Sequence, residues 1–401
     1  MSTRQCVRQG QLGNRIPGEQ LAMLQANQYL EPLFAPFSGG GLTLPNRFVM
    51  APMTRFFSPE GVPDARVAAY YKRRAAGGTG LIITEGTWIE HEAAGNDGRC
   101  PRFFGDDALA GWKLTVDAIH EAGGKVIPQL WHVGGQRKEA QQPNAGVSPI
   151  SPSGYKGPDL PVGKPMTQRD IDRAIEAYAK GAMTAQQLGF DGVELHAAHG
   201  YLIDQFFWQG TNRRNDRYGG DLRQRTTFAA EIVRECRRRV GSGYPIVLRF
   251  SQWKLPDYNA RIVNSAQELE AFLAPLSNAG VDVFHVSTRR YWDAAFEGHS
   301  RTLAGWTKYI SGKPTIAVGS VGLAQPFLDS GGIQGSVPTT LERLAELYNA
   351  GEFDLVALGR MLVVNPDYVR RIQHEPLTTM PSFSSDMVRS QFRSGGPDEL
   401  H

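Results

Sequence analysis

The sequence predicts one α/β domain of the (β/α)8 TIM-barrel class. Eight short β-type runs alternate with eight helical runs, and this alternation is typical of a parallel sheet with helical crossovers. The 401-residue chain suits one barrel with insertions, because the barrel itself takes about 250 residues. No Gly-x-Gly-x-x-Gly follows the first predicted strand, which counts against a Rossmann domain.

The predicted elements follow the chain in order. The strands are short apolar runs at 47–53, 80–86, 125–132, 192–196, 245–251, 283–288, 314–320 and 355–360. The helices are predicted at 66–76, 108–122, 168–189, 225–240, 266–279, 302–311 and 340–350, with a last helix that begins at Pro366.

End signals support several of these helices. Ser265 with Glu268 has the spacing of a capping box, and Thr167 with Asp170 resembles one. Asn365 precedes a proline and is predicted to cap the last helix. Glycines at positions 189 and 280 are predicted to end two other helices.

The predicted barrel has a flanking segment at each end and two long insertions. We expect a loosely ordered N-terminal extension at 1–30, the barrel at 31–375 and a C-terminal tail at 376–401. The insertions, 133–166 and 289–301, follow strands three and six. Both emerge at the carboxyl ends of the strands, so they are predicted to act as lids or to bind substrate.

Composition excludes several classes of protein. The net charge is +3, from 43 basic and 40 acidic residues, and this balance argues against nucleic-acid or membrane partners. The arginine-rich stretch 213–239 contains interspersed acids and is predicted to be a solvated helix face. Three cysteines lie far apart, which predicts no disulfide framework and a cytoplasmic location. No apolar run approaches the ~18 residues of a membrane span.

The stretch 192–218 contains the densest group of reactive side chains. His196, His199 and Tyr201 follow the alternating apolar pattern of the fourth strand, at the end where parallel α/β folds place their chemistry. Two histidines three apart also suit a metal or a structural hydrogen bond. A zinc site needs three or four ligands, and no third histidine or cysteine stands at ligand spacing. Hydrogen-bond donation to a ligand is therefore favoured, and no metal is expected.

The other predicted strand ends are polar and almost free of acids. Barrels often bind phosphate after strands seven and eight, where this chain has Gly319, Ser320, Gly359 and Arg360. Glycines let backbone N–H groups approach a phosphate, and an arginine supplies a bidentate charge. An ordinary turn would have the same residues, but the pairing of two such sites favours phosphate binding.

Six motifs resemble those of the Old Yellow Enzyme family, the flavin-dependent ene-reductases. They are APMTR, TEG, QLWH, LRFS, the HAAHGYLIDQFF segment and the TNRRNDRYGGDLRQRTTF segment, and the resemblance extends from about 33 to 372. It implies an FMN cofactor and NADPH or NADH as the reductant. The implied FMN-binding residues are Pro52, Met53, Thr54, Gly86, Gln129, Arg249, Gly319, Ser320, Gly359 and Arg360.

The resemblance also implies a mechanism. His196 and His199 would donate hydrogen bonds to the carbonyl or nitro oxygen of an α,β-unsaturated substrate, and Tyr201 would protonate the α-carbon. The hydride would pass from NAD(P)H through flavin N5 to the β-carbon in a ping-pong cycle. Trp131, Tyr291 and Trp292 are further predicted substrate-binding residues.

Other readings remain open at this point. One is a flavin barrel of the dienoyl-CoA reductase or amine dehydrogenase type, but its Fe–S cysteines are missing here. A second is a flavin-free phosphate-binding lyase or isomerase, which would want a lysine or carboxylate at a strand end. There the clear acids are Glu85 and Glu194. A third is a non-catalytic binding protein. A small-molecule substrate is the expected partner, and the resemblance is compatible with a homo-oligomer.

Overall fold

The computed structural model describes residues 27–140, 142–324, 328–329, 332–333 and 339–384. Most of the predicted N-terminal extension and residues 385–401 of the predicted tail therefore lie outside the described residues. The described parts of both segments contact the barrel. The Asn27 amide donates hydrogen bonds to the carbonyl oxygens of Ile372 and Glu375, at 2.9 and 2.8 Å. Met380 and Phe383 lie beyond the predicted boundary at residue 375, yet both are buried in the core.

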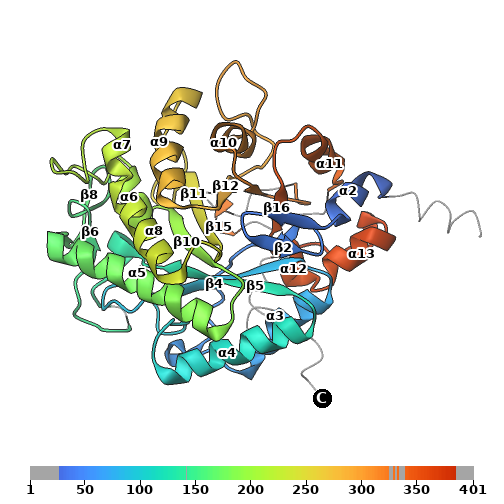
Figure 1. Ribbon diagram of the computed structural model, residues 1–401, viewed down its shortest axis with the longest axis horizontal. Helices are drawn as coiled ribbons and strands as arrows, with labels where there is room; N and C mark the ends of the chain where they lie inside the picture. The colour runs from blue at the N-terminus through green and yellow to red at the C-terminus, as the bar shows by residue number, and fades with distance from the viewer. Residues whose placement is uncertain (1–26, 141, 325–327, 330–331, 334–338, 385–401) are drawn as a thin grey trace, which may run out of the picture.

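Eight parallel strands close into a barrel, so the predicted fold class is confirmed (Figure 1). Their order around the barrel follows the chain, and every predicted strand is present. The strands are β3 (Phe48–Met50), β4 (Leu81–Trp88), β5 (Lys125–Trp131), β10 (Val193–His199), β11 (Ile246–Lys254), β12 (Val283–Ser287), β13 (Thr315–Val318) and β16 (Leu355–Leu358).

Helices surround this barrel and bury the outer faces of its strands (Figure 1). The main ones are α3 (Ala65–Ala76), α4 (Asp106–Glu121), α5 (Gln168–Leu188), α8 (Thr227–Val240), α9 (Ala266–Ala279), α10 (Leu303–Ser311), α11 (Glu342–Asn349) and α13 (Tyr368–His374). Shorter helices are α2 (Glu31–Phe34), α6 (Leu202–Phe207), α7 (Leu222–Arg225) and α12 (Arg360–Val364). Within the described residues, no helix combines the length and the apolar character that crossing a bilayer requires.

The predicted helix caps have mixed outcomes. Thr167 and Asp170 form the expected capping box, and Gly189 and Gly280 end their helices in the left-handed region. Ser265 accepts from the Glu268 backbone N–H, but the Glu268 carboxylate binds the N–H of the preceding Asn264. The cap predicted at Asn365 is wrong, because α12 occupies the preceding residues and Asn365 ends it.

A hairpin fills the lower end of the barrel. It consists of β1 (Phe37–Gly39) and β2 (Leu42–Leu44), and its turn lies against the residues that begin β11 and β12. Its apolar side chains pack with those of the strands in one buried cluster that includes Val49, Ile127 and Val247. Burial of this apolar surface stabilises the closed end of the barrel.

The insertion after β5 contains secondary structure of its own. The 3-10 helix η3 (Gly134–Gln136) is followed by β6 (Ile150–Ser151), β7 (Tyr155–Gly157), β8 (Leu160–Pro161) and β9 (Lys164–Pro165). These strands form two small two-stranded sheets, β6 with β9 and β7 with β8. A further pair, β14 (Leu328–Asp329) and β15 (Gly332–Ile333), follows β13.

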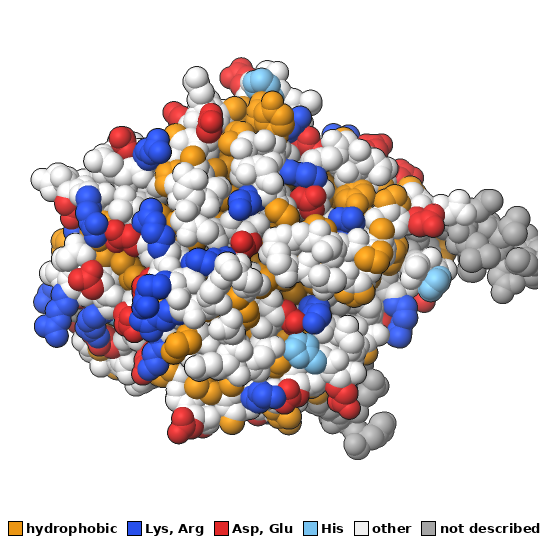
Figure 2. Space-filling model, in the orientation of Figure 1, with side chains coloured by type: hydrophobic (Ala, Val, Ile, Leu, Met, Phe, Trp, Pro, Cys, Tyr) orange, Lys and Arg blue, Asp and Glu red, His pale blue; other side chains and the backbone are white. Residues whose placement is uncertain are grey.

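The arginine-rich stretch lies on the outside of α8, as predicted. Figure 2 shows basic side chains interspersed with acidic ones over the side of the molecule that α5 and α8 form. Arg238 and Arg239 pair with Glu235, and Arg217 pairs with Glu231. Arg225 is an exception, since it is buried and donates to the carbonyl oxygen of Phe207. These surface pairs offset part of the positive charge on this face.

Candidate active site

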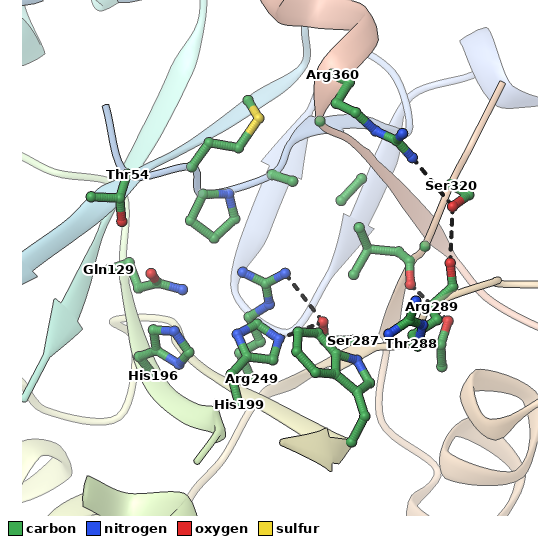
Figure 3. A pocket seen from close by; sticks show the side chains of 18 of the residues that line it. Thr54, Gln129, His196, His199, Arg249, Ser287, Thr288, Arg289, Ser320 and Arg360 are labelled. Atoms are coloured by element: carbon green, nitrogen blue, oxygen red, sulfur yellow. Dashed lines mark hydrogen bonds between the residues drawn. The ribbon is translucent and has the colours of Figure 1, made fainter. Parts of the chain in front are cut away.

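A cavity of about 560 Å³ opens at the carboxyl ends of the barrel strands. Seven of the eight strands, or the residues that follow them, contribute to its lining, and β4 is the exception. This volume lies within the range of about 300–1,000 Å³ that small-molecule sites occupy. Figure 3 shows the labelled polar side chains converging on the cavity from different strands.

The structure brings together most of the residues predicted for the site. Thirteen of them line this cavity: Pro52, Met53, Thr54, Gln129, Trp131, His196, His199, Tyr201, Arg249, Gly319, Ser320, Gly359 and Arg360. No described residue of the 133–166 insertion lines it, whereas Arg289 does so from the connection after β12.

Three predicted residues lie outside the lining. Gly86 pairs with Gln129 in the sheet, and a Cβ on Gly86 would lie 2.7 Å from the Trp131 ring, so its glycine makes room for that ring. Tyr291 and Trp292 instead pack edge to face against each other and against the core. The hydrogen bond from the Tyr291 N–H to the Gly319 carbonyl turns this segment away from the cavity.

A β-bulge directs both histidines into the cavity. Side chains three apart on a regular strand point to opposite faces, because the period of a strand is two. The pairing of β10 with β11 is irregular between Ala197 and His199, where the backbone of His199 has φ of +65°. Such bulges re-aim side chains near active sites. As a result the imidazoles of His196 and His199 lie 5.1 Å apart.

Tyr201 and Trp131 complete an aromatic group around His196. The Tyr201 ring lies 5.0 Å from both His196 and Trp131, edge to face with each. Trp131 lies nearly parallel to His196 at 6.3 Å. These contacts hold an imidazole and a phenol at neighbouring points of one cavity wall.

Burial sets the protonation states of these groups. It lowers the pKa of His196 and that of His199 well below the usual value, and the nearby Arg249 guanidinium adds to both shifts. Burial also raises the pKa of the Tyr201 phenol, with a smaller contribution from Cys100. At neutral pH the imidazoles are therefore neutral, and the phenol keeps its proton.

The turn that connects His199 to Tyr201 is held by a buried ion pair. Lys254 Nζ donates to Asp204 Oδ1 at 2.7 Å and to the Ser251 carbonyl, and both charged side chains are fully buried. Asp204 Oδ2 accepts from the Gly200 N–H at 2.6 Å. Because Gly200 separates His199 from Tyr201, this pair fixes the turn that places them.

The acids nearest to the cavity are engaged elsewhere. Glu194 accepts from Gln129 Nε2 at 2.8 Å and lies 2.6 Å from His285 Nδ1, below the cavity. Glu85 pairs with Arg55 at 2.7 Å, and both side chains are buried. No Asp or Glu lines the cavity among the described residues.

A glycine-containing cradle lies at the carboxyl ends of the two final strands. Gly319 has φ of +151°, and a Cβ there would lie 2.6 Å from the Thr288 carbonyl oxygen, so only glycine fits. Ser320 adopts φ of +52°, and its hydroxyl accepts from Arg360 Nη2 at 3.3 Å. Burial lowers the pKa of Arg360 to about 10. A guanidinium at the edge of an acid-free cavity favours an anionic ligand.

Arg249 is a second guanidinium at this acid-free cavity, and it too favours a ligand with hydrogen-bond acceptors. This arginine is 7% exposed, its Nε has no hydrogen-bond partner among the described residues, and burial lowers its pKa. The cavity therefore fits a ligand with a phosphate near Arg360 and further acceptors near Arg249, as FMN has. Within the described residues, no group of three or more His, Cys, Asp or Glu side chains could hold a metal ion.

Several lining residues were not found by sequence reasoning. Trp253 stacks on His199 at 4.2 Å. It continues the every-second-residue series of Arg249 and Ser251, and a predicted strand that extended to Lys254, as β11 does, would have included it. Phe383 reaches the cavity from the predicted tail, and no local pattern indicates this. The remaining unexpected residues include Phe56, Leu255, Tyr258 and Ser287.

The fold and the cavity define a barrel enzyme whose site is built for an anionic, hydrogen-bonding ligand. The sequence profile of the NADH:flavin oxidoreductase / NADH oxidase family matches residues 32–378. The chain belongs to this family, which is the Old Yellow Enzyme family that its motifs resemble. It is accordingly an FMN-dependent oxidoreductase that takes electrons from NADH or NADPH.

Individual relatives agree with this assignment. 12-Oxophytodienoate reductase 7 of Oryza sativa subsp. japonica is 32% identical over 379 residues, which are 90% of this chain and 91% of the relative. NADH oxidase of Thermoanaerobacter brockii is 33% identical over 349 residues, and the match covers 84% of this chain and half of that protein. The structure of morphinone reductase in complex with tetrahydroNAD superimposes with a TM-score of 0.75 at 28% identity, covering 91% of this chain and 95% of the other.

Proposed function

We propose that the chain reduces the C=C bond of α,β-unsaturated carbonyl or nitro compounds in a ping-pong cycle. When bound, FMN accepts a hydride from NADH or NADPH and delivers it to the β-carbon of the alkene. The observation that supports this most directly is the wall where neutral His196 and His199 stand beside protonated Tyr201. Hydrogen-bond donors and an acid together suit an electron-poor alkene.

The side chains that would hold FMN come from two groups. Arg360 and Ser320, with Gly319 and Gly359, would bind its phosphate, while Gln129, Arg249 and Thr54 would bind its ring. Pro52 and Met53 contribute lining between these groups. The cation at Arg249 would favour negative charge on the bound ring, which raises its tendency to accept electrons.

The residues on the adjoining wall, which His196, His199 and Tyr201 form, would act on the alkene. His196 and His199 would donate hydrogen bonds to the substrate oxygen, which makes the β-carbon electrophilic and stabilises the enolate-like charge. Tyr201 would give its phenolic proton to the α-carbon as general acid. Trp131 would border the substrate beside Tyr201.

His196→Ala should lower the turnover of cyclohexenone by about 10²–10³-fold, because an oxyanion-type donor is removed. The measurement is steady-state turnover with saturating NADPH. His374→Ala is the matched control, since His374 is exposed on α13 and lies outside the cavity lining. Wild-type turnover in the His196 variant would exclude that role.

Arg360→Met should weaken FMN binding about 10- to 100-fold, since hydrogen bonds to charged groups contribute about 1.5–3 kcal/mol. Fluorescence titration of apoprotein with FMN measures the affinity. Arg343→Met removes the same charge from the exposed face of α11 and should leave the affinity unchanged. Equal affinities in all three proteins would remove Arg360 from the phosphate site.

The decisive test of the proposed function is a visible absorption spectrum under anaerobic conditions. A flavin spectrum that bleaches with NADPH or NADH and recovers with cyclohexenone supports the proposal. A spectrum that bleaches but does not recover would leave the chain an NAD(P)H-dependent flavoenzyme and exclude the activated alkene as its acceptor.

Location and assembly remain predictions. We propose a cytoplasmic location, which the two described cysteines support, because Cys100 and Cys236 are both buried and free. Fractionation of cells that express the chain would test it. A homo-oligomer also remains a prediction, and light scattering after size-exclusion chromatography would determine the assembly.

A further inference from the structure

Ser287 touches two groups of the site at once. It ends β12, is 3% exposed and lines the cavity. Its hydroxyl oxygen lies 2.8 Å from His199 Nε2 and 3.3 Å from Arg249 Nη2 (Figure 3). One hydroxyl therefore joins the cation proposed for the FMN ring to an imidazole proposed for the substrate.

The hydrogen atoms in this contact can be assigned by counting donors. A guanidinium can only donate, so the Ser287 oxygen accepts from Arg249. The hydroxyl has one proton of its own to donate. Among the described residues, the acceptor within reach of that proton is His199 Nε2. Ser287 therefore donates to Nε2, and neutral His199 must then have its proton on Nδ1.

The opposite arrangement is less favourable. If His199 donated from Nε2, the Ser287 proton would have no partner in the described part of the chain. Leaving a buried donor unpaired costs about 1–3 kcal/mol. An unprotonated Nδ1 would also present a lone pair to the cavity, where it would repel the oxygen of a substrate.

We propose that Ser287 is a positioning residue that fixes His199 as the Nδ1–H tautomer and so directs an N–H into the cavity. His199 Nδ1 makes no hydrogen bond within the described residues, which leaves it available to a ligand. The proposal deepens the proposed function and rests on it for the role of that N–H in alkene reduction. The tautomer itself does not depend on that function.

The His199 ring is held in place, so its tautomer decides whether Nδ1 presents an N–H or a lone pair to the cavity. Trp253 stacks on the ring at an interplanar angle of 21°, and His196 contacts it edge to face. The His199 backbone N–H donates to Ser251 Oγ at 2.9 Å, and its carbonyl accepts from the Leu255 N–H at 3.1 Å. Rotation of the ring by 180° would put Cε1 in the place of Nε2 and break the contact with Ser287, so the ring keeps Nε2 toward Ser287.

The tautomer can be measured directly by NMR on the FMN-loaded protein labelled with 15N-histidine. Long-range 1H–15N correlations distinguish a protonated Nδ1 from a protonated Nε2, and a His199→Gln variant assigns the signals of His199. We expect a protonated Nδ1 in the wild type and a shift of the proton toward Nε2 in Ser287→Ala. A wild-type His199 with its proton on Nε2 would overturn the proposal, whether or not the protein reduces alkenes.

Kinetics test the consequence for catalysis. Ser287→Ala should lower kcat and kcat/KM for cyclohexenone alike, about 10-fold, which is less than the ~10²–10³ expected when a donor is lost outright. Ser287→Thr keeps a hydroxyl and should restore the tautomer and most of the rate. Ser151→Ala removes a buried hydroxyl outside the cavity lining and should match the wild type.

The outcomes separate this inference from the proposed function. If the wild type reduces no activated alkene, the proposed function fails while the NMR result still decides the tautomer. If the wild type is active and Ser287→Ala retains both its tautomer and its rate, the positioning role is excluded. Thermal unfolding and bound FMN absorbance of each variant show whether a lost rate reflects a lost fold.

Discussion

Tyr201→Phe is expected to slow alkene reduction about 10²–10⁴-fold, the usual contribution of a positioned general acid. The variant keeps the ring that packs against His196 and Trp131, so it removes the proton and little else. Burial raises the pKa of this phenol, which keeps it protonated at neutral pH. Stopped-flow absorbance measures the two half-reactions separately.

The reduction of bound FMN by NADPH should change far less, because that step needs no proton from Tyr201. Tyr368→Phe is the matched control: its phenol is buried on α13, has no hydrogen-bond partner in the part of the chain that the structure describes, and lies outside the cavity lining. Equal slowing of both half-reactions in Tyr201→Phe would show that this residue is not the proton donor.

Lys254→Met is expected to lower the free energy of unfolding by about 3–5 kcal/mol, because it leaves the Asp204 carboxylate buried without its partner. The turn at Gly200 should loosen as well, so alkene reduction should fall with stability. Urea unfolding at saturating FMN measures the loss. The exposed pair of Lys113 with Asp117 is the control, and Lys113→Met should cost at most about 1 kcal/mol.

The loss of stability in Lys254→Met should increase as pH rises. Burial raises the pKa of Asp204 to about 6 even though Lys254 is present, and removal of the cation raises it further. The folded variant then binds a proton that the folded wild type has released, so the variant loses stability more steeply as pH rises. We expect a small deficit at pH 5 and a larger one at pH 8.

A compensating variant tests the same explanation. In Asp204→Asn combined with Lys254→Met, no charge is buried, and the asparagine oxygen can still accept from the Gly200 N–H. Most of the stability should return. A double variant as unstable as Lys254→Met, with a deficit that does not change with pH, would show that packing around Lys254 matters and charge does not.

Local patterns were sufficient to predict the barrel. Each strand is a short apolar run, and apolar residues recur along each long helix at the helical period. The eight units can therefore be recognised without knowledge of their contacts. The location of the residues at the strand ends then follows, because the fold brings the carboxyl ends of all strands to one face. This is why Gln129, His196, Arg249 and Arg360 could be placed in one cavity from sequence.

The remaining features depend on contacts between distant segments. Tyr291 and Trp292 follow a strand end, but a backbone hydrogen bond to Gly319 turns them into the core. Phe383 reaches the cavity from beyond the last helix. The bulge before His199 has no residue signature, because alanines precede it and the irregularity arises from pairing with β11.

The hairpin that fills the lower end of the barrel has a kinetic consequence. Apolar side chains of β1 and β2 close the amino-terminal end of the barrel. In the described part of the chain, the opening at the carboxyl ends of the strands is therefore the route for every reactant. We therefore expect the nicotinamide and the alkene to bind one after the other through this opening, each product leaving before the next reactant enters. Excess enone should accordingly behave as a competitive inhibitor of NADPH, and its inhibition should disappear as the NADPH concentration rises.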